Sequence, residues 1–339
     1  MNKKLAFALT AVLVASLSCG FLGSGLSNPT TPTQNPPNLA TAYAYPSVTP
    51  LPTPLGYSMP PTAQTATRVP RPQKDIASHT SKIDRDITYC TANNVDLKMD
   101  LYFPKLLNGP MPIVVYVHGG GWTSGDKRDG AGALDFPALL DAGFIVGAVN
   151  YRLAPQAQFP AMIEDVKCAI RFLRANASQY NINPNEIGAW GGSAGGHLVS
   201  LLGVTDQSAG FDVGQYLDQS SRVQAVVDMF GPADLTTGFS KAYANMRDMV
   251  FGTFDLAKAS PVTYITADDP PFLILQGDAD KTVPLSQSQE FYDKLTAAGV
   301  QAQLVIVHGG PHGLNSPTET PSRSELTQMI VNFFSQHLK

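Results

Sequence analysis

Ser193 lies between glycines in the run GGSAGG (191–196), which follows the apolar run IGAW (187–190) and precedes a second apolar stretch. The residues Gly191 to Gly195 fit the pattern G-x-S-x-G. In that pattern a sharp turn between a strand and a helix strains the serine backbone and exposes the hydroxyl. Glycines also occur in ordinary turns, but the strand before and the helix after are the context that a nucleophile requires. We therefore predict that Ser193 is a nucleophile.

A serine hydroxyl needs a general base, and the base needs an acid that orients it. Two later loops, each after an apolar run, hold residues of these types: Asp278 and Asp280 in GDADKTVP (277–284), and His308 and His312 in HGGPHGL (308–314). The chain order Ser, Asp, His is therefore present, with two choices for each partner. The two histidines are four residues apart, but the Gly-Gly-Pro between them excludes the helix on which that spacing would suit a metal ion. We predict no metal site there.

The run HGGGW (118–122) directly follows the apolar run 112–117. Three glycines after a strand cost conformational entropy and add no packing, so they need a reason in the backbone. Attack on an ester carbonyl places negative charge on its oxygen, which fixed N–H groups stabilise best. We predict that the amides of Gly120, Gly121 and Ala194 form this oxyanion hole, and no cofactor is implied.

Five other residues near these motifs are predicted to have structural roles. His118 and Trp122 brace the glycine loop, His197 packs inside the fold, and Arg152 pairs with Asp165.

Strand-like runs predict eight strands, at 85–90, 97–103, 113–117, 145–149, 187–190, 223–230, 272–276 and 303–307. Helical patterns alternate with the later strands, at 160–177, 194–204, 286–298 and 322–338. The first two strands are close enough in sequence to form a hairpin, and the later alternation demands right-handed parallel crossovers. We predict an α/β fold with a mostly parallel eight-stranded sheet and helices on both faces. The loops at the carboxyl ends of its strands would carry the site.

The chain resembles the α/β-hydrolase superfamily, in the branch of hormone-sensitive-lipase-like esterases and BD-FAE-type feruloyl and acetyl-xylan esterases. The matching stretches are HGGGW, NYRLAP (150–155), 159–177, WGGSAGGHL (190–198), FGPADL (230–235), SPVTYI (260–265), 268–284 and HGGPHGL. The resemblance implies an α/β-hydrolase fold and a serine carboxylesterase, in which Ser193 attacks, His312 is the base and Asp280 the acid. Gly192 stands where hormone-sensitive-lipase-like members carry Asp or Glu, which favours the BD-FAE-like branch. Gln276 stands where many relatives have histidine.

Two other functions are compatible with the sequence. An amidase or peptidase of the same fold, similar to prolyl oligopeptidase or to kynurenine formamidase, would use the same residues. The 75 residues ahead of the fold are too few for the propeller of the first, and an export signal argues against the second. A non-catalytic surface-binding module is disfavoured because all three dispersed residues of the arrangement are present.

The substrate is expected to be a small ester, or an acetyl or feruloyl ester on a polysaccharide. Residues 76–84, between the spacer and the first predicted strand, are too few for an N-terminal helical cap, so the cap candidates are segments 205–222 and 236–259. An open site of this kind favours short acyl groups or esters displayed on a polymer.

The chain has 339 residues, is 43% hydrophobic and 15% charged, and carries a net charge of −4. This composition is that of a globular protein, and the charge gives no electrostatic basis for nucleic-acid binding. Cys90 and Cys168 would be free to form a disulfide in an oxidising compartment, but buried unpaired cysteines fit the sequence equally well.

Residues 1–19 combine Lys3 and Lys4 with a short apolar stretch, which predicts an export signal. Cys19 stands where a lipoprotein carries its lipidated cysteine and would tether the protein to a membrane. However, Ser16 replaces the usual leucine of a lipobox, so ordinary signal cleavage is an equal alternative. Residues 20–75 are rich in Pro and Thr and predict a disordered spacer. Residues 76–339 are the predicted catalytic domain of a secreted or cell-surface protein.

Overall fold

The computed structural model describes residues 76–339, except residues 107, 133–134 and 238–240. The predicted export signal, Cys19 and the spacer lie outside the described residues. Among the described residues, the helices are all too short or too polar to cross a membrane.

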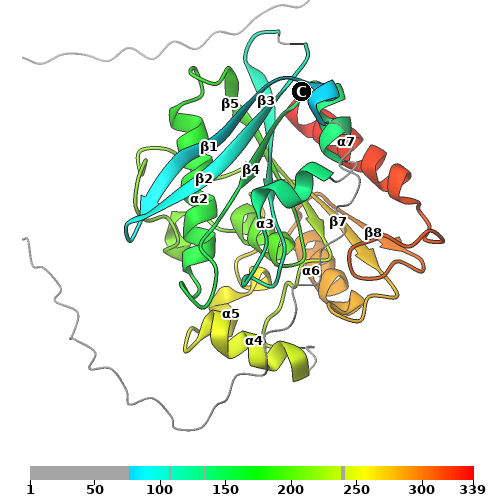
Figure 1. Ribbon diagram of the computed structural model, residues 1–339. Coiled ribbons are helices and arrows are strands. Elements are labelled where there is room, and N and C mark those ends of the chain that lie inside the picture. Colours follow the sequence, from blue (N-terminus) through cyan, green and yellow to red (C-terminus); the bar gives the residue numbers. More distant parts are fainter. Residues whose placement is uncertain (1–75, 107, 133–134, 238–240) are drawn as a thin grey trace, which may run out of the picture. The chain divides into compact units, whose positions relative to one another are not determined.

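One eight-stranded sheet forms the centre of the domain (Figure 1). Its strands are β1 (Thr80–Ala92), β2 (Val95–Pro104), β3 (Met111–Val117), β4 (Ile145–Val149), β5 (Ile182–Gly192), β6 (Ala225–Met229), β7 (Phe272–Gly277) and β8 (Ala302–Val307). They lie in the order β1-β2-β4-β3-β5-β6-β7-β8. Only β2 runs against the others: it pairs antiparallel with β1 and β4, and the remaining pairs are parallel. The predicted hairpin and the predicted mostly parallel sheet are confirmed.

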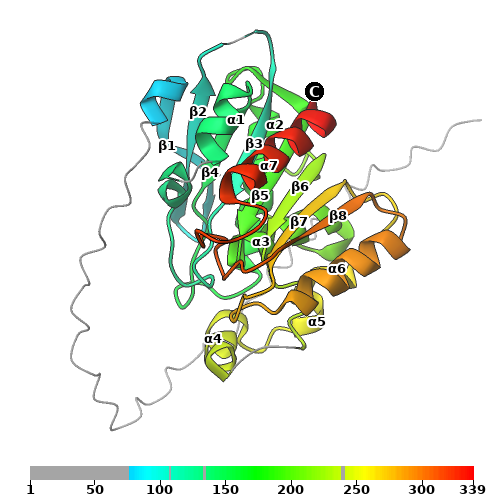
Figure 2. The same cartoon turned by 90° about the vertical axis from the view of Figure 1, so that its right-hand side faces the viewer.

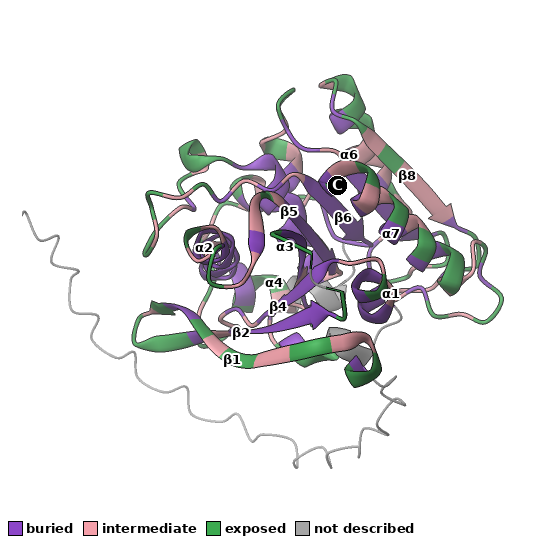
Figure 3. Ribbon diagram, turned by 90° about the horizontal axis from the view of Figure 1, so that it is seen from above, coloured by how far each residue is buried: buried purple, intermediate pink, exposed green. Residues whose placement is uncertain are grey.

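Helices cover both faces of this sheet (Figure 2). α2 (Ala161–Ala175), α3 (Ala194–Val204) and α6 (Leu285–Ala297) pack on one face, and α1 (Asp135–Asp141) and α7 (Arg323–Leu338) pack on the other. In β3, Ile113, Val115 and Val117 belong to the first core and Val114 to the second. Because a parallel strand is buried on both faces, its sequence is a continuous apolar run. The central strands are accordingly buried, whereas the edge strands β1 and β8 are partly exposed (Figure 3).

The four predicted helices are confirmed to within a few residues. The sequence did not predict three others: α1, α4 (Lys241–Phe251) and α5 (Leu256–Ala259). α4 and α5 fall in segment 236–259, one of the two cap candidates, and lie beyond one end of the sheet (Figure 2).

The other cap candidate, segment 205–222, is fixed to the flank of the domain. Arg171, buried in α2, donates to the Asp212 carboxylate at 2.6 Å and to the Gln215 carbonyl at 3.0 Å. The buried Lys167 ammonium, one turn earlier, pairs with the same carboxylate at 2.9 Å. Since two cations share one buried anion here, this segment is part of the framework and not a mobile cover.

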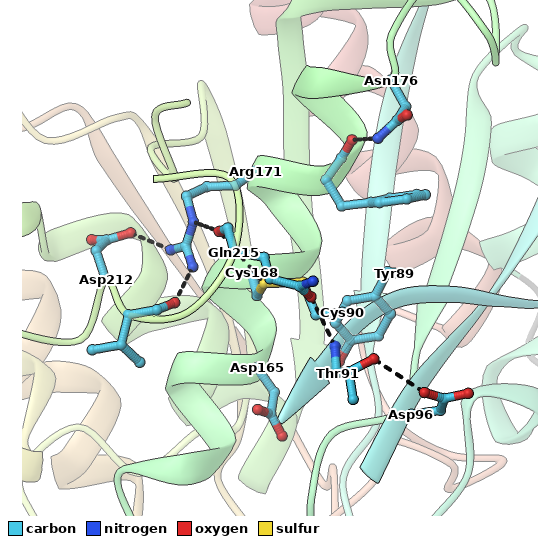
Figure 4. Close-up of a disulfide and its surroundings, with 12 residues drawn as sticks. Tyr89, Cys90, Thr91, Asp96, Asp165, Cys168, Arg171, Asn176, Asp212 and Gln215 are labelled. Carbon is cyan, nitrogen blue, oxygen red and sulfur yellow. Dashed lines mark hydrogen bonds and ion pairs between the residues drawn. A yellow bond between two sulfur atoms is a disulfide. The ribbon is translucent and has the colours of Figure 1, made fainter. Parts of the chain in front are cut away.

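A disulfide joins the same region to the edge of the sheet. Cys90 in β1 and Cys168 in α2 are bonded, with their Cα atoms 6.5 Å apart (Figure 4). Gln215 also accepts a hydrogen bond from the Thr91 amide, the residue after Cys90, at 2.9 Å. The two cysteines are therefore paired, and β1, α2 and segment 205–222 are cross-linked.

Replacing both cysteines with alanine should lower the free energy of unfolding. The bond closes a loop of 78 residues, for which loop-closure entropy gives about 4.5 kcal/mol. Urea denaturation of the Cys90→Ala/Cys168→Ala variant, with the wild type in the same oxidising buffer as control, measures this loss. Equal midpoints and slopes for the two proteins would mean that the bond contributes nothing.

Candidate active site

Ser193 occupies a strained turn between β5 and α3. Its φ and ψ are 57° and −122°, a left-handed backbone that a residue with a side chain rarely adopts. The turn is held because the Ser193 amide donates to the Met229 carbonyl at 2.9 Å, at the end of β6. Helix and strand also cross closely: a Cβ on Gly195 would lie 2.1 Å from the Val117 carbonyl oxygen, so only glycine fits. The turn therefore has the strained strand-to-helix geometry that the sequence pattern predicts.

Ser193, His312 and Asp280 form one hydrogen-bonded chain. His312 Nε2 lies 2.9 Å from Ser193 Oγ, and His312 Nδ1 lies 2.8 Å from Asp280 Oδ2. Because a carboxylate accepts but does not donate, Nδ1 carries the proton and Nε2 is left to accept from the serine hydroxyl. The three residues come from the loops after β5, β7 and β8, which end at the same edge of the sheet.

Asp280 is held in its ionised form. Burial of its side chain, 0% exposed, would by itself raise its pKa. Hydrogen bonds from His312 and from the amides of Thr282 (2.7 Å) and Val283 (3.0 Å) outweigh this effect, and the pKa is lowered. The His312 side chain is 27% exposed, so solvent reaches the hydrogen-bonded triad at the histidine.

The competing pair, Asp278 and His308, lies on the same two loops but is directed elsewhere. His308 Nδ1 lies 2.9 Å from Asp278 Oδ2, and the Gly309 amide donates to Asp278 Oδ1 at 2.7 Å. The hydrogen bond with His308 lowers the pKa of Asp278. The His308 side chain is 73% exposed. The structure therefore brings His312 into contact with both Ser193 and Asp280, whereas Asp278 and His308 contact each other.

The glycine loop passes directly over Ser193. A Cβ on Gly119 would lie 2.8 Å from the Gly192 carbonyl oxygen and 3.5 Å from Ser193 Cβ. The next residue, Gly120, has φ +103°, and its carbonyl accepts from two amides of the following turn. The predicted oxyanion donors Gly120, Gly121 and Ala194 thus belong to the two segments that meet at the serine.

The segment NYRLAP braces this loop. The Tyr151 ring stacks on His118 at 4.3 Å, and the Tyr151 hydroxyl donates to the His118 carbonyl at 2.9 Å. The Ala154 amide donates to the Trp122 carbonyl at 2.9 Å, and Trp122 Nε1 donates to His197 Nδ1 at 3.3 Å. The predicted bracing roles of His118 and Trp122 are confirmed.

The predicted structural roles of His197 and of the Arg152–Asp165 pair are also confirmed. His197 is fully buried and donates from Nε2 to the Ala259 carbonyl at 2.8 Å. Burial lowers its pKa to about 4, although that hydrogen bond opposes the shift, so the ring is neutral at neutral pH. Arg152 contacts Asp165 through its backbone amide and its guanidinium at 2.7–3.0 Å, which fixes the start of the bracing segment.

Two residues at the site were not predicted. The Phe230 ring, after β6, lies 4.9 Å from the His312 ring, and a Cβ on Gly192 would come within 3.0 Å of it. Its place at the carboxyl end of the predicted strand 223–230, where the site was expected, could have identified it from the sequence. Met246 of α4 lies against Gly121, whose Cβ would be 2.8 Å from the Met246 sulfur. Nothing in the sequence signalled this contact, because α4 itself was not predicted.

Across the described part of the chain, no three or more His, Cys, Asp or Glu side chains come together in a way that could hold a metal ion. His308 and His312, the pair with metal-like spacing, each contact a different aspartate.

Comparison with known sequences identifies related esterases. The profile of the family described as BD-FAE matches residues 99–295. The chain is 35% identical to the probable carboxylic ester hydrolase LipM of Mycobacterium tuberculosis over 237 residues, which are 64% of this chain and 53% of LipM. It is 32% identical to the esterase LipQ of the same organism, over 68% of this chain and 56% of LipQ. The chain thus spans about half the length of these curated relatives.

Comparison with solved structures confirms the α/β-hydrolase esterase fold. A truncated carbohydrate esterase from gut microbiota superposes with a TM-score of 0.67 at 30% identity, covering 76% of this chain and 96% of that one. Esterase 2 of Thermogutta terrifontis, solved after phosphonylation by sarin, gives a TM-score of 0.64 at 25% identity, covering 74% and 92%.

Replacing Asp280 with asparagine, or His312 with alanine, should abolish most of the hydrolysis of p-nitrophenyl acetate. Loss of the orienting acid lets the imidazole adopt the wrong tautomer, which in a serine protease costs about 10⁴-fold in kcat. The matched controls are Asp278→Asn and His308→Ala, which remove the neighbouring exposed pair and should change kcat little. A collapse confined to the control variants would assign the catalytic roles to the other pair.

Proposed function

The chain belongs to the BD-FAE family, and on that premise we propose that it is a serine carboxylesterase that acts through an acyl-enzyme. The observation that carries the proposal is the hydrogen-bonded chain from Asp280 through His312 to Ser193. Its nucleophile sits on a strained turn directly beneath the glycine loop.

In the proposed mechanism, His312 takes the proton of Ser193 as the hydroxyl attacks the ester carbonyl. The carbonyl oxygen becomes negative and is stabilised by the amides of Gly120, Gly121 and Ala194. Collapse of this intermediate expels the alcohol, which receives the proton from His312. A water molecule, deprotonated by His312, then attacks the acyl carbonyl. The bond between the acyl group and Ser193 Oγ breaks, the acid leaves, and His312 returns the proton to Ser193. Asp280 stays ionised throughout and stabilises the imidazolium.

The proposed substrates are esters of short acids, either small or attached to a polysaccharide. Met246 lies on Gly121, so the space beside the proposed oxyanion donors is narrow. On the opposite side of the serine, the Phe230 ring covers Gly192 and borders His312. These two side chains favour a small acyl group, and the resemblance to a carbohydrate esterase supports polymer-linked acetate as one source of it.

A series of p-nitrophenyl esters should be hydrolysed with kcat/KM falling as the acyl chain lengthens from acetate to octanoate, and acetylated xylan should release acetate. Ser193→Ala should hydrolyse none of these esters. Hydrolysis of p-nitroacetanilide, an amide, is measured in parallel to test the alternative that the protein is an amidase. Rates that rise toward octanoate would contradict the short-acyl proposal. Cleavage of the anilide and of none of the esters would mean that the protein is an amidase and not an esterase.

The same series on Met246→Ala should shift the preference toward longer chains, because a shorter side chain opens the space beside Gly121. Met249→Ala is the matched control, since this methionine lies one turn further along α4 and is 39% exposed. An unchanged chain-length profile in Met246→Ala would mean that this side chain does not limit the acyl group.

The proposed location is outside the cytoplasm, either secreted or tethered through a lipidated Cys19. The basic and apolar residues 1–19 support export, and the Cys90–Cys168 disulfide is of a kind that persists in oxidising compartments. Blocking free thiols before lysis of the source cells should leave both cysteines unlabelled. Full labelling of the two residues would contradict export.

A further inference from the structure

Asp280 receives a second side-chain hydrogen bond on the oxygen that faces His312. Gln276, near the end of β7, places Nε2 3.2 Å from Asp280 Oδ2, the atom that lies 2.8 Å from His312 Nδ1. Gln276 is 0% exposed. Two donors therefore share one carboxylate oxygen inside the protein.

The orientation of this amide is fixed by its surroundings. Nε2 also lies 3.1 Å from the Val283 carbonyl and 3.2 Å from the Gly277 carbonyl. Carbonyl oxygens only accept, so the atom that faces them must be the nitrogen. At the other end, Ser288 of α6 donates from its hydroxyl to Gln276 Oε1 at 2.9 Å. The amide cannot turn its oxygen toward Asp280 without losing all of these bonds.

We propose that Gln276 is a positioning residue that moderates the pull of Asp280 on the His312 proton, and thereby extends the working range of the site toward mildly acidic pH. The proposal rests on the esterase function proposed above. An N–H donor neutralises part of the charge on Oδ2, so the carboxylate attracts an imidazolium less strongly. Without this donor, His312 would hold a second proton up to a higher pH. A doubly protonated ring cannot accept the proton of Ser193.

The other charged groups on the surrounding elements are engaged elsewhere or exposed. They are Asp278, paired with His308; Lys281, exposed beside Asp280; Asp234, whose carboxylate accepts from Thr236; and Glu290 of α6, paired with Lys294. Asp228 of the neighbouring strand β6 is buried, which raises its pKa to about 6, but its carboxylate accepts from the Ser200 hydroxyl and the Gly231 amide. Its titration is common to the wild type and to both variants used in the test below. The Phe230 ring, 4.9 Å from the His312 ring, is uncharged. Gln276 is therefore the uncharged side chain best placed to modify the Asp280–His312 pair.

The test compares the wild type with Gln276→Met, which has a similar length but no donor. The acid limb of the pH profile of kcat/KM should move up by about half to one pH unit, which lowers activity on the limb about three- to tenfold. The plateau at alkaline pH should change little. A proton NMR spectrum should show the His312 Nδ1 proton further downfield, because its bond to Asp280 becomes stronger.

Ser288→Ala is the matched control. It removes a hydrogen bond from the other end of the same buried amide but leaves the donor to Asp280 in place, so its acid limb should not move. A folded Gln276→Met protein with an unmoved limb and an unmoved Nδ1 proton would reduce Gln276 to a packing role. An equal shift in Ser288→Ala would do the same, because the effect would then come from loosened packing.

Two further readouts keep the test independent of folding and of turnover. If Gln276→Met does not fold, the side-chain amide protons of Gln276 in the wild type should shift with pH in step with protonation of His312. Amide protons that stay constant through that transition would overturn the proposal. If the wild type hydrolyses none of the esters, the function proposal fails, and the position of the Nδ1 proton in Gln276→Met still decides the role of Gln276.

Discussion

The close crossing of β5, α3 and the end of β3 is the constraint on which the site depends. A serine with φ 57° is tolerated because its amide is held by the end of β6 and because glycines let the backbones approach. The parallel register pairs Val117 with Gly191, so the loops after these two strands begin side by side. The glycine loop therefore lies over Ser193 as a direct consequence of the sheet's register.

The same register explains how residues more than a hundred positions apart meet. β6, β7 and β8 lie in order beside β5, and the loops that follow them carry Phe230, Asp280 and His312 in the same order. Burying the Asp280 charge would be costly without partners. Four donors satisfy it: two backbone amides of its own loop, His312 and Gln276. The turn after β7 is thus built around one anion, and the position of the imidazole follows from it.

The sequence predicted those features that depend on local pattern. Strand-like runs, continuous and apolar in the central parallel strands, located all eight strands, and the glycines around Ser193 located the turn, because both follow from short-range chemistry. The pairing of Cys90 with Cys168 was not predictable, since it depends on how β1 packs on α2. α4 was not predicted from the sequence, because the burial of Val250 and Phe251 at its end depends on the folded chain. The contact of Met246 with Gly121 could therefore not be predicted either. The orientation of the Gln276 amide depends on carbonyls and a hydroxyl that only the folded chain brings together.

Two histidine–aspartate pairs on adjacent loops differ in environment more than in chemistry. Both have an Nδ1-to-carboxylate distance near 2.9 Å, yet the His308 side chain is 73% exposed and the His312 side chain 27%. Water screens the exposed pair, so its carboxylate does little to stabilise a charged ring. Around Asp280 the carboxylate is removed from water, and each hydrogen bond to it has a larger effect on the charge of the ring. For that reason a single uncharged donor such as Gln276 can influence the buried pair, whereas an equivalent donor beside His308 would have little effect.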